Sequence, residues 1–568
     1  MLNSIKCKAK FRKLLVYLFI LSSILKFNVL LGKNSYLISY VPYELFGREK
    51  AYSKTIDEAV DYLNKYDGFV FSGGNARNLW LMECGGSDAL DSIKKLAGNL
   101  RWGFTGGVWV EPDYGFSGDE SVIRQLIYGK KYINKKFETD PQTAMVTGIK
   151  GMSPDIPQIF SKSGINYLLV TGKEAVGLNR FFWEAADGSR VLVQRVVPFR
   201  EYGKTANPEA DSRLYGVEFA CGVSKYNGSV KKTRALLEKA SSGIKFIMAE
   251  DFFKGIDFND KSIPVIKTDW VEKRQVPAEA VLMDAEKFHV FCRLYRWAEF
   301  PVEVFRGLWD RVVVKNQRAY VEKNAMDLLH RAIGILSAHI DTTGSWKSAI
   351  VFNTHSREMD GQVEICLEMI GNPPVVCITD TSGEIIESKV VVVKGKRKLI
   401  FEAVKVPPVG YRRYGILPVP GKGDKEGEVN TAGSQAEGPF YVRLEDEHKG
   451  ELGGMHFFVK VEPESVELTT VKFCDCGPGS IILRLRENSG NTAQARMIFP
   501  DVHHFIGSWE SDLTERRLRG IGLQENEEFS NPLPTKEFER AALDIQVKPY
   551  EIKTIKLLFY SLHKPLIR

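Results

Sequence analysis

The segment from Trp109 to Asp113 (Trp-Val-Glu-Pro-Asp) places one aromatic ring and two carboxylates close together in the sequence. An aromatic face can contact the C–H groups of a sugar ring, and carboxylates can accept hydrogen bonds from its hydroxyls. Alternatively, Trp109 packs in a core, and Glu111 and Asp113 accept hydrogen bonds from backbone N–H groups of a loop. Their expected position at the end of a strand favours sugar binding.

A pair of carboxyl groups would allow a different chemistry. Glu44 could pair with Glu111 or Asp113 and hydrolyse a glycosidic bond without a metal. Retaining hydrolysis needs two carboxyl groups about 5–5.5 Å apart. The sequence does not set that distance, so this rebuilt site stays a hypothesis.

Metal-binding side chains are scarce where they would matter. The first 288 residues contain no histidine, and none of the eight cysteines forms a Cys-x-x-Cys pair. His503 and His504 are adjacent in a strand-like segment, where alternation points them to opposite faces. We therefore expect no Cys-rich zinc module and no joint ligation by these histidines, and we expect the cysteines to be free and buried.

Asp155 lies in Ser-Pro-Asp just ahead of a helical stretch. A carboxylate at that position interacts favourably with the helix dipole. We expect Asp155 to cap the helix rather than to act as a nucleophile.

The elements that would position these residues alternate between strands and helices. Strands are predicted at 36–41, 68–72, 107–110, 143–147 and 167–171, and helices at 51–66, 89–96, 120–136 and 154–163. Continuous apolar strands separated by helices are typical of a parallel sheet covered on both faces. An active site in such a fold lies at the carboxyl ends of the strands.

The pattern changes twice further along the chain. Two helical stretches, 277–300 and 302–339, carry apolar residues at three- and four-residue spacing. From residue 348 the spacing becomes two, which predicts strands at 349–352, 363–367, 375–379, 389–393 and 398–404. A polar, glycine-rich linker near 418–438 precedes further strands.

Composition and charge bound the class of protein. At 568 residues the chain needs two to four domains, and 78 basic against 71 acidic side chains give a net charge of only +7. The basic residues are scattered, so we expect no nucleic-acid partner. A basic segment and the apolar run 14–25 at the N-terminus predict a signal peptide or membrane anchor, the only expected membrane contact.

Six strings in order resemble glycoside hydrolase family 38, the retaining α-mannosidases. Three lie in the α/β region: GGVWVEPDYGFSGDESVIRQLIYGKKYINKKF at 106–137, GMSPDIPQIFSKSGINYLLVTG at 151–172 and FFWEAADGSRVLV at 181–193. The others are KRQVPAEAVLMDAEKFHVFCRLYRWA at 273–298, VPPVGYRRYGIL at 406–417 and VKPYEIKTIKLLF at 547–559. Trp183 and Glu184 replace the family's aromatic pair, and we expect Trp183 to pack in the core.

The resemblance implies a seven-stranded β/α barrel, then a three-helix bundle, then β-sandwich domains. It also implies a zinc ion held by a His-x-Asp pair, a nucleophilic aspartate and a later histidine, with a second carboxylic acid as proton donor. This chain has Pro42 and Glu44 in place of the His-x-Asp pair and Gly148 in place of the nucleophile. Ala319 stands in place of the later histidine, and Val223 is the closest counterpart of the proton donor. Zinc requires imidazole, thiolate or carboxylate donors, so no zinc or other cofactor is expected.

We therefore predict a secreted or membrane-anchored relative of these α-mannosidases that has lost its zinc-dependent machinery. It would bind a mannose-containing glycan or glycoprotein, or act as a scaffold. The alternatives are an active glycosidase built on Glu44, Glu111 and Asp113, and a chain that has kept no ligand. The predicted segments are 1–33 (signal or anchor), 34–262 (barrel), 263–345 (helical bundle), 346–419 (sandwich, first part), 420–438 (linker) and 439–568 (sandwich, second part).

Overall fold

The computed structural model describes most of the chain, and the predicted signal or anchor at 1–33 and the predicted linker at 420–438 lie outside the described residues. The described ranges are 36–41, 48–115, 117–149, 151–171, 178–198, 214–221, 227–238, 245–254, 256–268, 276–314, 317–373, 375–418, 440–475, 479–500, 505–521 and 541–559. The chain divides into two compact units, Met1–Val271 and Glu272–Arg568.

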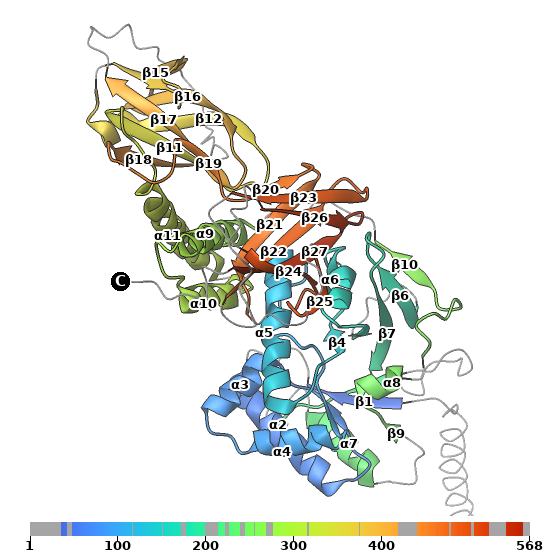
Figure 1. The fold of residues 1–568 in the computed structure, drawn as a ribbon. Coiled ribbons are helices and arrows are strands. Elements are labelled where there is room, and N and C mark those ends of the chain that lie inside the picture. Colours follow the sequence, from blue (N-terminus) through green and yellow to red (C-terminus); the bar gives the residue numbers. More distant parts are fainter. Residues whose placement is uncertain are drawn as a thin grey trace, which may run out of the picture. The chain divides into compact units, whose positions relative to one another are not determined.

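The first unit is built on a mostly parallel sheet (Figure 1). Seven of its strands are β1 (Tyr36–Tyr40), β2 (Phe71–Ser72), β3 (Trp102–Gly103), β4 (Thr143–Val146), β5 (Tyr167–Val170), β7 (Arg190–Pro198) and β8 (Leu214–Glu218). They pair in parallel in the order β3-β2-β1-β8-β7-β5-β4. Beyond β3, the N–H of Gly106 donates to the carbonyl of Thr143 at the start of β4 (2.9 Å).

Three further strands extend this sheet. They are β6 (Arg180–Glu184), β9 (Lys245–Phe246) and β10 (Val265–Lys267). Strand β6 runs antiparallel to β7, while β10 pairs in parallel with β6 and β9 with β1. Because β10 belongs to this sheet, the first unit extends past the domain end predicted at residue 262.

Helices are interleaved with these strands, as the sequence pattern predicts. They are α2 (Glu49–Lys65), α3 (Ala76–Cys84), α4 (Ala89–Gly98), α5 (Asp119–Phe137), α6 (Ile156–Lys162), α7 (Asn227–Glu238) and α8 (Ala249–Phe253). Helix α2 buries Tyr52, Ile56, Ala59 and Leu63, which recur at helical spacing. Helix α3 was not predicted.

The strand predicted at 107–110 is wrong. The N–H groups of Trp109 and Val110 donate to Gln125 of α5, and the carbonyls of Val108 and Trp109 accept from the N–H groups of Ala76 and Arg77. The backbone hydrogen-bonding groups of this segment therefore pair with helices instead of strands. The strand of this region is β3, which ends at Gly103.

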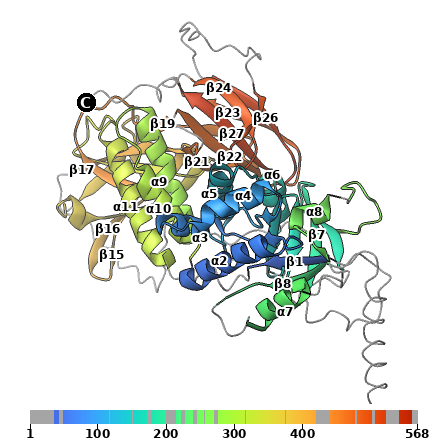
Figure 2. The ribbon, with the colours of Figure 1, turned by 90° about the horizontal axis from the view of Figure 1, so that it is seen from below.

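The second unit begins with three helices, α9 (Pro277–Leu294), α10 (Val302–Val312) and α11 (Arg318–Ser337). They lie side by side and contact one another (Figure 2). The helical stretch predicted at 302–339 is thus two helices, since α10 ends at Val312 and α11 begins at Arg318.

Antiparallel sheets form the rest of the second unit. One sheet has the order β14-β13-β17-β11-β18, with β19 also paired to β17, and a second has β12-β16-β15. The two sheets share one apolar core, to which Val351, Ile365, Phe401 and Tyr414 belong. Their strands are β11 (Lys347–Asn353), β12 (Met359–Cys366), β13 (Val376–Thr379), β14 (Ile385–Ile386), β15 (Ser388–Val393), β16 (Lys396–Val406), β17 (Gly410–Pro418), β18 (Tyr441–Asp446) and β19 (Met455–Phe457).

Two further sheets have the orders β20-β23-β26 and β21-β22-β27-β24-β25. Their strands are β20 (Lys460–Glu462), β21 (Val466–Phe473), β22 (Ser480–Glu487), β23 (Ala493–Phe499), β24 (Phe505–Ser511), β25 (Arg517–Gly520), β26 (Ala541–Val547) and β27 (Ile552–Phe559). Strand β23 alternates buried and exposed positions, the pattern of a strand with one covered face. A parallel α/β unit followed by antiparallel β-sheets confirms the predicted order of fold classes.

Within the described ranges, no helix combines the length and apolar character that a membrane crossing requires. Five cysteines in the part of the chain that the structure describes are free, and of these Cys221 and Cys292 are buried as expected while Cys84 is exposed. Cys474 is disulfide-bonded, which corrects the expectation of free cysteines at that position.

Candidate functional site

A cavity of about 330 Å³ opens at the carboxyl end of β4. It is lined by two loops: Glu111, Pro112, Asp113, Tyr114 and Gly115 precede α5, and Val146, Thr147, Gly148, Gly151 and Met152 follow or end β4. The fold thus brings the predicted carboxylates Glu111 and Asp113 to the same cavity as Gly148. That cavity lies at the strand edge where a parallel α/β fold places its ligands.

Helix α5 holds the segment that leads into Glu111. The Trp109 N–H donates to the Gln125 carbonyl (2.8 Å), and the Val110 N–H donates to Oε1 of the Gln125 side chain (3.0 Å). A Cβ added to Gly129 would lie 2.3 Å from the Gly107 carbonyl oxygen and 2.5 Å from the Trp109 nitrogen. Glycine at 129 therefore lets the segment lie directly on the helix.

The two loops of the cavity are also joined to each other. The Ser153 N–H donates to the Tyr114 carbonyl (3.1 Å), and a Cβ on Gly115 would lie 2.4 Å from the Gly151 carbonyl oxygen. The Tyr114 ring packs edge-on against Phe160 of α6, with 5.7 Å between centroids. The two loops are thus held together by a backbone hydrogen bond, a ring contact and a close approach at Gly115 that requires glycine.

Glu111 is half-buried at this cavity. Burial raises the pKa of its carboxyl to about 7, and a hydrogen bond from the Tyr114 hydroxyl acts in the opposite direction. Near neutrality Glu111 can therefore either donate or accept a proton. A carboxyl with such a pKa in a cavity is a recognised mark of a functional site.

Asp113 is exposed at the same cavity. Its Oδ1 accepts the Gly115 N–H (3.2 Å), and its carbonyl accepts the Ser117 N–H (2.8 Å). Asp113 therefore accepts hydrogen bonds from backbone N–H groups of its own loop, which is the alternative to sugar binding. Asp113 is thus part of the turn and part of the cavity wall at once.

Trp109 lies in the core. Its side chain is 5% exposed and packs against Trp80 (5.6 Å) and Tyr132 (5.8 Å). It is not among the residues that line the cavity. The packing alternative describes Trp109, because a buried ring offers no face to a sugar.

Gly148 has no side chain that could act as a nucleophile, and its backbone is also unusual. Its φ is +97°, in the region that L residues with a Cβ rarely adopt. An aspartate at this position would have to fit a backbone conformation suited to glycine.

Two of the four positions matched to the implied zinc ligands, Gly148 and Ala319, are described, and neither carries a donor side chain. Within the described ranges, no group of three His, Cys, Asp or Glu side chains is arranged to hold a metal ion. Ala319 carries only a methyl group and lies exposed in α11. Pro42, Glu44, Val223, His503 and His504 lie outside the described residues. In the full sequence, however, the whole first unit contains no histidine.

Three other predicted residues lie apart from this cavity's lining. Trp183 is 3% exposed in β6, as expected of a packing residue, and Glu184 pairs with Lys267 (3.2 Å). Asp155 precedes α6 as predicted, yet its side chain makes no capping hydrogen bond to the helix.

Sequence reasoning missed Glu250, in the first turn of α8. The Oε2 atom of Glu250 would lie 2.8 Å from a Cβ added to Gly103, at the end of β3. This oxygen atom has no hydrogen-bond partner among the described residues. Burial raises the pKa of Glu250 to about 7. The string Ala-Glu-Asp-Phe-Phe resembles an ordinary acidic helix start, so the sequence carried no signal for this residue.

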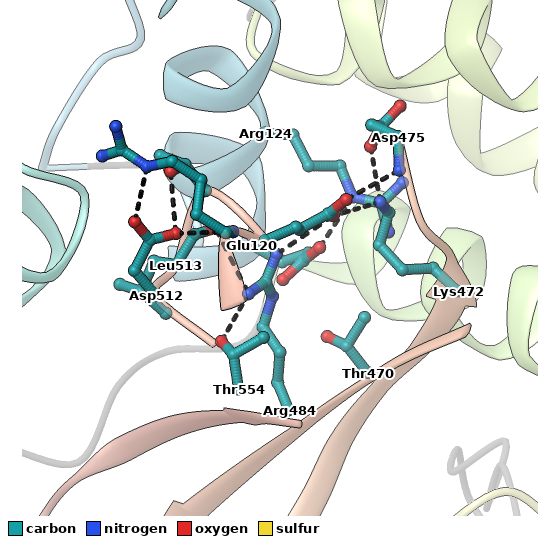
Figure 3. Close-up of polar contacts among 12 residues, drawn as sticks. Glu120, Arg124, Thr470, Lys472, Asp475, Arg484, Asp512, Leu513 and Thr554 are labelled. Carbon is teal, nitrogen blue, oxygen red and sulfur yellow. Dashed lines mark hydrogen bonds and ion pairs between the residues drawn. The ribbon is translucent and has the colours of Figure 1, made fainter. Parts of the chain in front are cut away.

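In the second unit, carboxylates pair with cationic side chains in a polar network, of which Figure 3 shows Lys472, Asp475 and Arg484. Glu515 accepts hydrogen bonds from Lys472 Nζ (2.5 Å) and the Asp475 N–H (2.7 Å), and Arg484 Nη2 lies 3.9 Å away. Arg484 also donates to Thr554 Oγ1 (2.8 Å). These contacts tie β21, β22 and β27 to the turn after β24, so we assign the network a structural role.

Two family models and the relatives with similar sequences point to the same family. The model described as glycosyl hydrolases family 38 N-terminal domain matches residues 38–245, and that of the family 38 C-terminal beta sandwich domain matches residues 465–555. Alpha-mannosidase G of Dictyostelium discoideum is 27% identical over 145 residues, 25% of this chain and 13% of that protein. Alpha-mannosidase 2C1 of Homo sapiens is 28% identical over 157 residues, 27% of this chain and 15% of that protein.

The matched segments thus span only 13% and 15% of these two relatives. Among solved structures, an alpha-mannosidase from Enterococcus faecalis V583 aligns with 93% of this chain and 87% of its own, at 10% identity and a TM-score of 0.49.

Proposed function

The chain belongs to glycoside hydrolase family 38, and we propose that it binds a mannose-bearing glycan or glycoprotein without the zinc-dependent hydrolysis that the resemblance implies. The observation that carries this proposal is the cavity itself. It is lined by the carboxyl groups of Glu111 and Asp113 and by Gly148, which the resemblance matches to the nucleophile. Sugar hydroxyls find acceptors there, while the nucleophile and histidine ligands have no counterpart.

The loss of zinc chemistry is tested by measuring zinc in the purified protein together with hydrolysis of an aryl α-mannoside, with and without chelator. We expect no stoichiometric zinc and no chelator-sensitive turnover. Chelator-sensitive turnover would overturn this part of the proposal.

Glycan binding is tested by a screen against mannose-bearing glycans with Glu111→Leu and Asp113→Ala. Each change removes an acceptor from the cavity wall, so we expect affinity to fall about tenfold or more, equivalent to about 1.4 kcal/mol. The matched control is Glu184→Leu, because Glu184 is outside the cavity lining. Absence of binding to every mannose-bearing glycan would overturn this part of the proposal.

A second candidate is favoured by one observation. Glu111, whose pKa is raised to about 7 by burial, shares a cavity with Asp113, the combination needed for a proton-donating acid beside a carboxylate. In this metal-free glycosidase, Glu111 would protonate the leaving oxygen. Turnover that resists chelator and disappears in both Glu111→Gln and Asp113→Asn would establish it.

The finer architecture is also a proposal. We propose that the seven parallel strands close into a barrel, that α9 to α11 form a three-helix bundle, and that the paired antiparallel sheets are sandwiches. The hydrogen bond from Gly106 to Thr143 supports closure, since it links the two ends of the strand order. The core shared by two sheets supports a sandwich.

Export from the cytoplasm, as a secreted or membrane-anchored protein, rests on the N-terminal residues of the sequence alone. Expression of the full chain in cells followed by fractionation and N-terminal sequencing tests it. A chain retained in the cytoplasm with its N-terminus intact would contradict it.

A further inference from the structure

Glu111 is fixed at the cavity by contacts that lie upstream of it in the chain. The backbone bends into the cavity directly after Val110, whose N–H donates to Gln125 Oε1 (3.0 Å). The preceding N–H, that of Trp109, donates to the Gln125 carbonyl (2.8 Å). One residue of α5 therefore binds two consecutive N–H groups just ahead of Glu111.

Gln125 is well placed to act as a rigid support. Its side chain is fully buried, and it lies in the middle of α5, which runs from Asp119 to Phe137. One turn further along the same helix, Gly129 lets the helix touch the backbone of 107–109 directly. A side chain held by a packed helix positions its partner more closely than one carried on a loop.

The far side of Glu111 is held by a different set of contacts. Tyr114 donates its hydroxyl to the Glu111 carboxyl, while its own carbonyl accepts the Ser153 N–H (3.1 Å). Glu111 thus lies between two anchors, Gln125 before it and Tyr114 after it. Of these, only Gln125 acts without touching the carboxyl or lining the cavity.

We propose that Gln125 is a positioning residue, which holds Glu111 in its desolvated place at the cavity through the Val110 N–H. This inference rests on the proposed function of the cavity. It extends that function to a residue of α5 that would not contact the ligand. A substitution that removes Oε1 of Gln125 leaves the Val110 N–H without this acceptor, so Val110 and Glu111 can move toward water.

The experiment follows the Glu111 carboxyl directly by NMR on protein with ¹³C-labelled glutamate, assigned by comparison with Glu111→Gln. In the native protein we expect a titration midpoint near 7. In Gln125→Met, which removes the acceptor, the midpoint should fall toward the ordinary glutamate value of 4.5. Gln125→Asn, which keeps an amide but shortens it, should shift the midpoint in the same direction if Gln125→Met fails to fold.

Two comparisons separate positioning from a general loss of structure. Gln125→Glu restores an acceptor oxygen, so its midpoint should stay at about 7 or rise. Gln194→Met removes an equally buried glutamine from β7, where it accepts from Arg180 (3.0 Å), and should leave the Glu111 midpoint unchanged. An unchanged midpoint in folded Gln125→Met or Gln125→Asn would overturn the proposal, as would an equal fall in Gln194→Met.

Affinity for a mannose-bearing glycan, measured on the same variants, keeps the two proposals distinguishable. We expect Gln125→Met to lose affinity about as much as Glu111→Leu does. Suppose that the Glu111 midpoint falls in Gln125→Met but that neither the native protein nor any variant binds a glycan. The positioning role then stands and the proposed function fails. If the native protein binds and the midpoint does not move, the positioning role fails alone.

Discussion

Glu111 in the first unit is half-buried and Glu515 in the second is fully buried, and their partners also differ. Glu515 accepts hydrogen bonds from Lys472 and the Asp475 N–H and lies near Arg484. Glu111 receives a hydrogen bond from a neutral phenol, and burial raises its pKa to about 7. Glu515 is thus part of a network of paired charges, whereas Glu111 has a neutral hydrogen-bond donor and a pKa near neutrality.

The largest effect that would test this comparison is expected at Glu515. Glu515→Gln removes the carboxylate that Lys472 binds together with that of Asp475 and that lies 3.9 Å from Arg484. Removing one partner of a buried ion pair costs about 3–5 kcal/mol. The free energy of unfolding, measured with urea, checks this value. The matched control is Glu364→Gln, whose partly exposed ion pair with Lys398 (2.8 Å) should contribute no more than about 1 kcal/mol. Equal effects of the two changes would show that the Glu515 network is not a structural tie.

A smaller effect is expected at Glu111, and it depends on pH. Its folded-state pKa of about 7 lies above the ordinary value of 4.5, so its contribution to stability is complete below 4.5 and is lost as pH rises through 7. Relative to Glu111→Gln, the native protein should lose on the order of 1–3 kcal/mol between about pH 4.5 and about pH 8. Unfolding free energies of both proteins at the two pH values measure this difference. A pH-independent difference would mean that Glu111 does not titrate in this range.

Gly148→Asp places an aspartate at the position that the resemblance matches to the nucleophile. We expect Gly148→Asp to cost about 1–3 kcal/mol, because its φ of +97° strains a residue with a side chain. It should also fail to restore chelator-sensitive turnover. Gly68→Asp is the control, since Gly68 is exposed with open space around its Cβ position. A Gly148→Asp protein as stable as the control would remove the backbone argument.

The smallest effect is expected from Tyr114→Phe. The Tyr114 hydroxyl lowers the pKa of Glu111, so its removal should raise the midpoint. A hydrogen bond of about 0.5–1.5 kcal/mol corresponds to a rise of about one pH unit or less. The ¹³C titration of Glu111 measures it, and a fall in the midpoint would show that Tyr114 positions Glu111 rather than stabilising its charged form.

Local patterns in the sequence were sufficient for several elements. The strands at 36–41, 143–147 and 167–171 were predicted to within a residue or two, because continuous apolar runs bounded by polar turns have few alternatives. The segment at 107–110 has the same apolar character but makes its hydrogen bonds to α3 and α5. The residue types of this segment do not predict whether its N–H groups donate to a strand or to a helix.

The candidate site divides in the same way. Glu111, Asp113 and Gly148 could be named from the sequence, because a family resemblance placed all three after strands. Trp109 could not be assigned, since a tryptophan in a core and one on a binding surface have the same sequence signature. Glu250 and the supporting role of Gln125 were invisible, because both depend on contacts between residues far apart in the chain.

The sequence by itself determined the family, the order of α/β, helical and β regions, and the lack of histidine before residue 289. These follow from residue identity and spacing, which need no coordinates. Only the tertiary structure decided that Glu111 and Asp113 share a cavity with Gly148 and that Trp109 is buried. It alone could do so, because desolvation and hydrogen-bond partners are properties of neighbours in space, and these determine the pKa of Glu111.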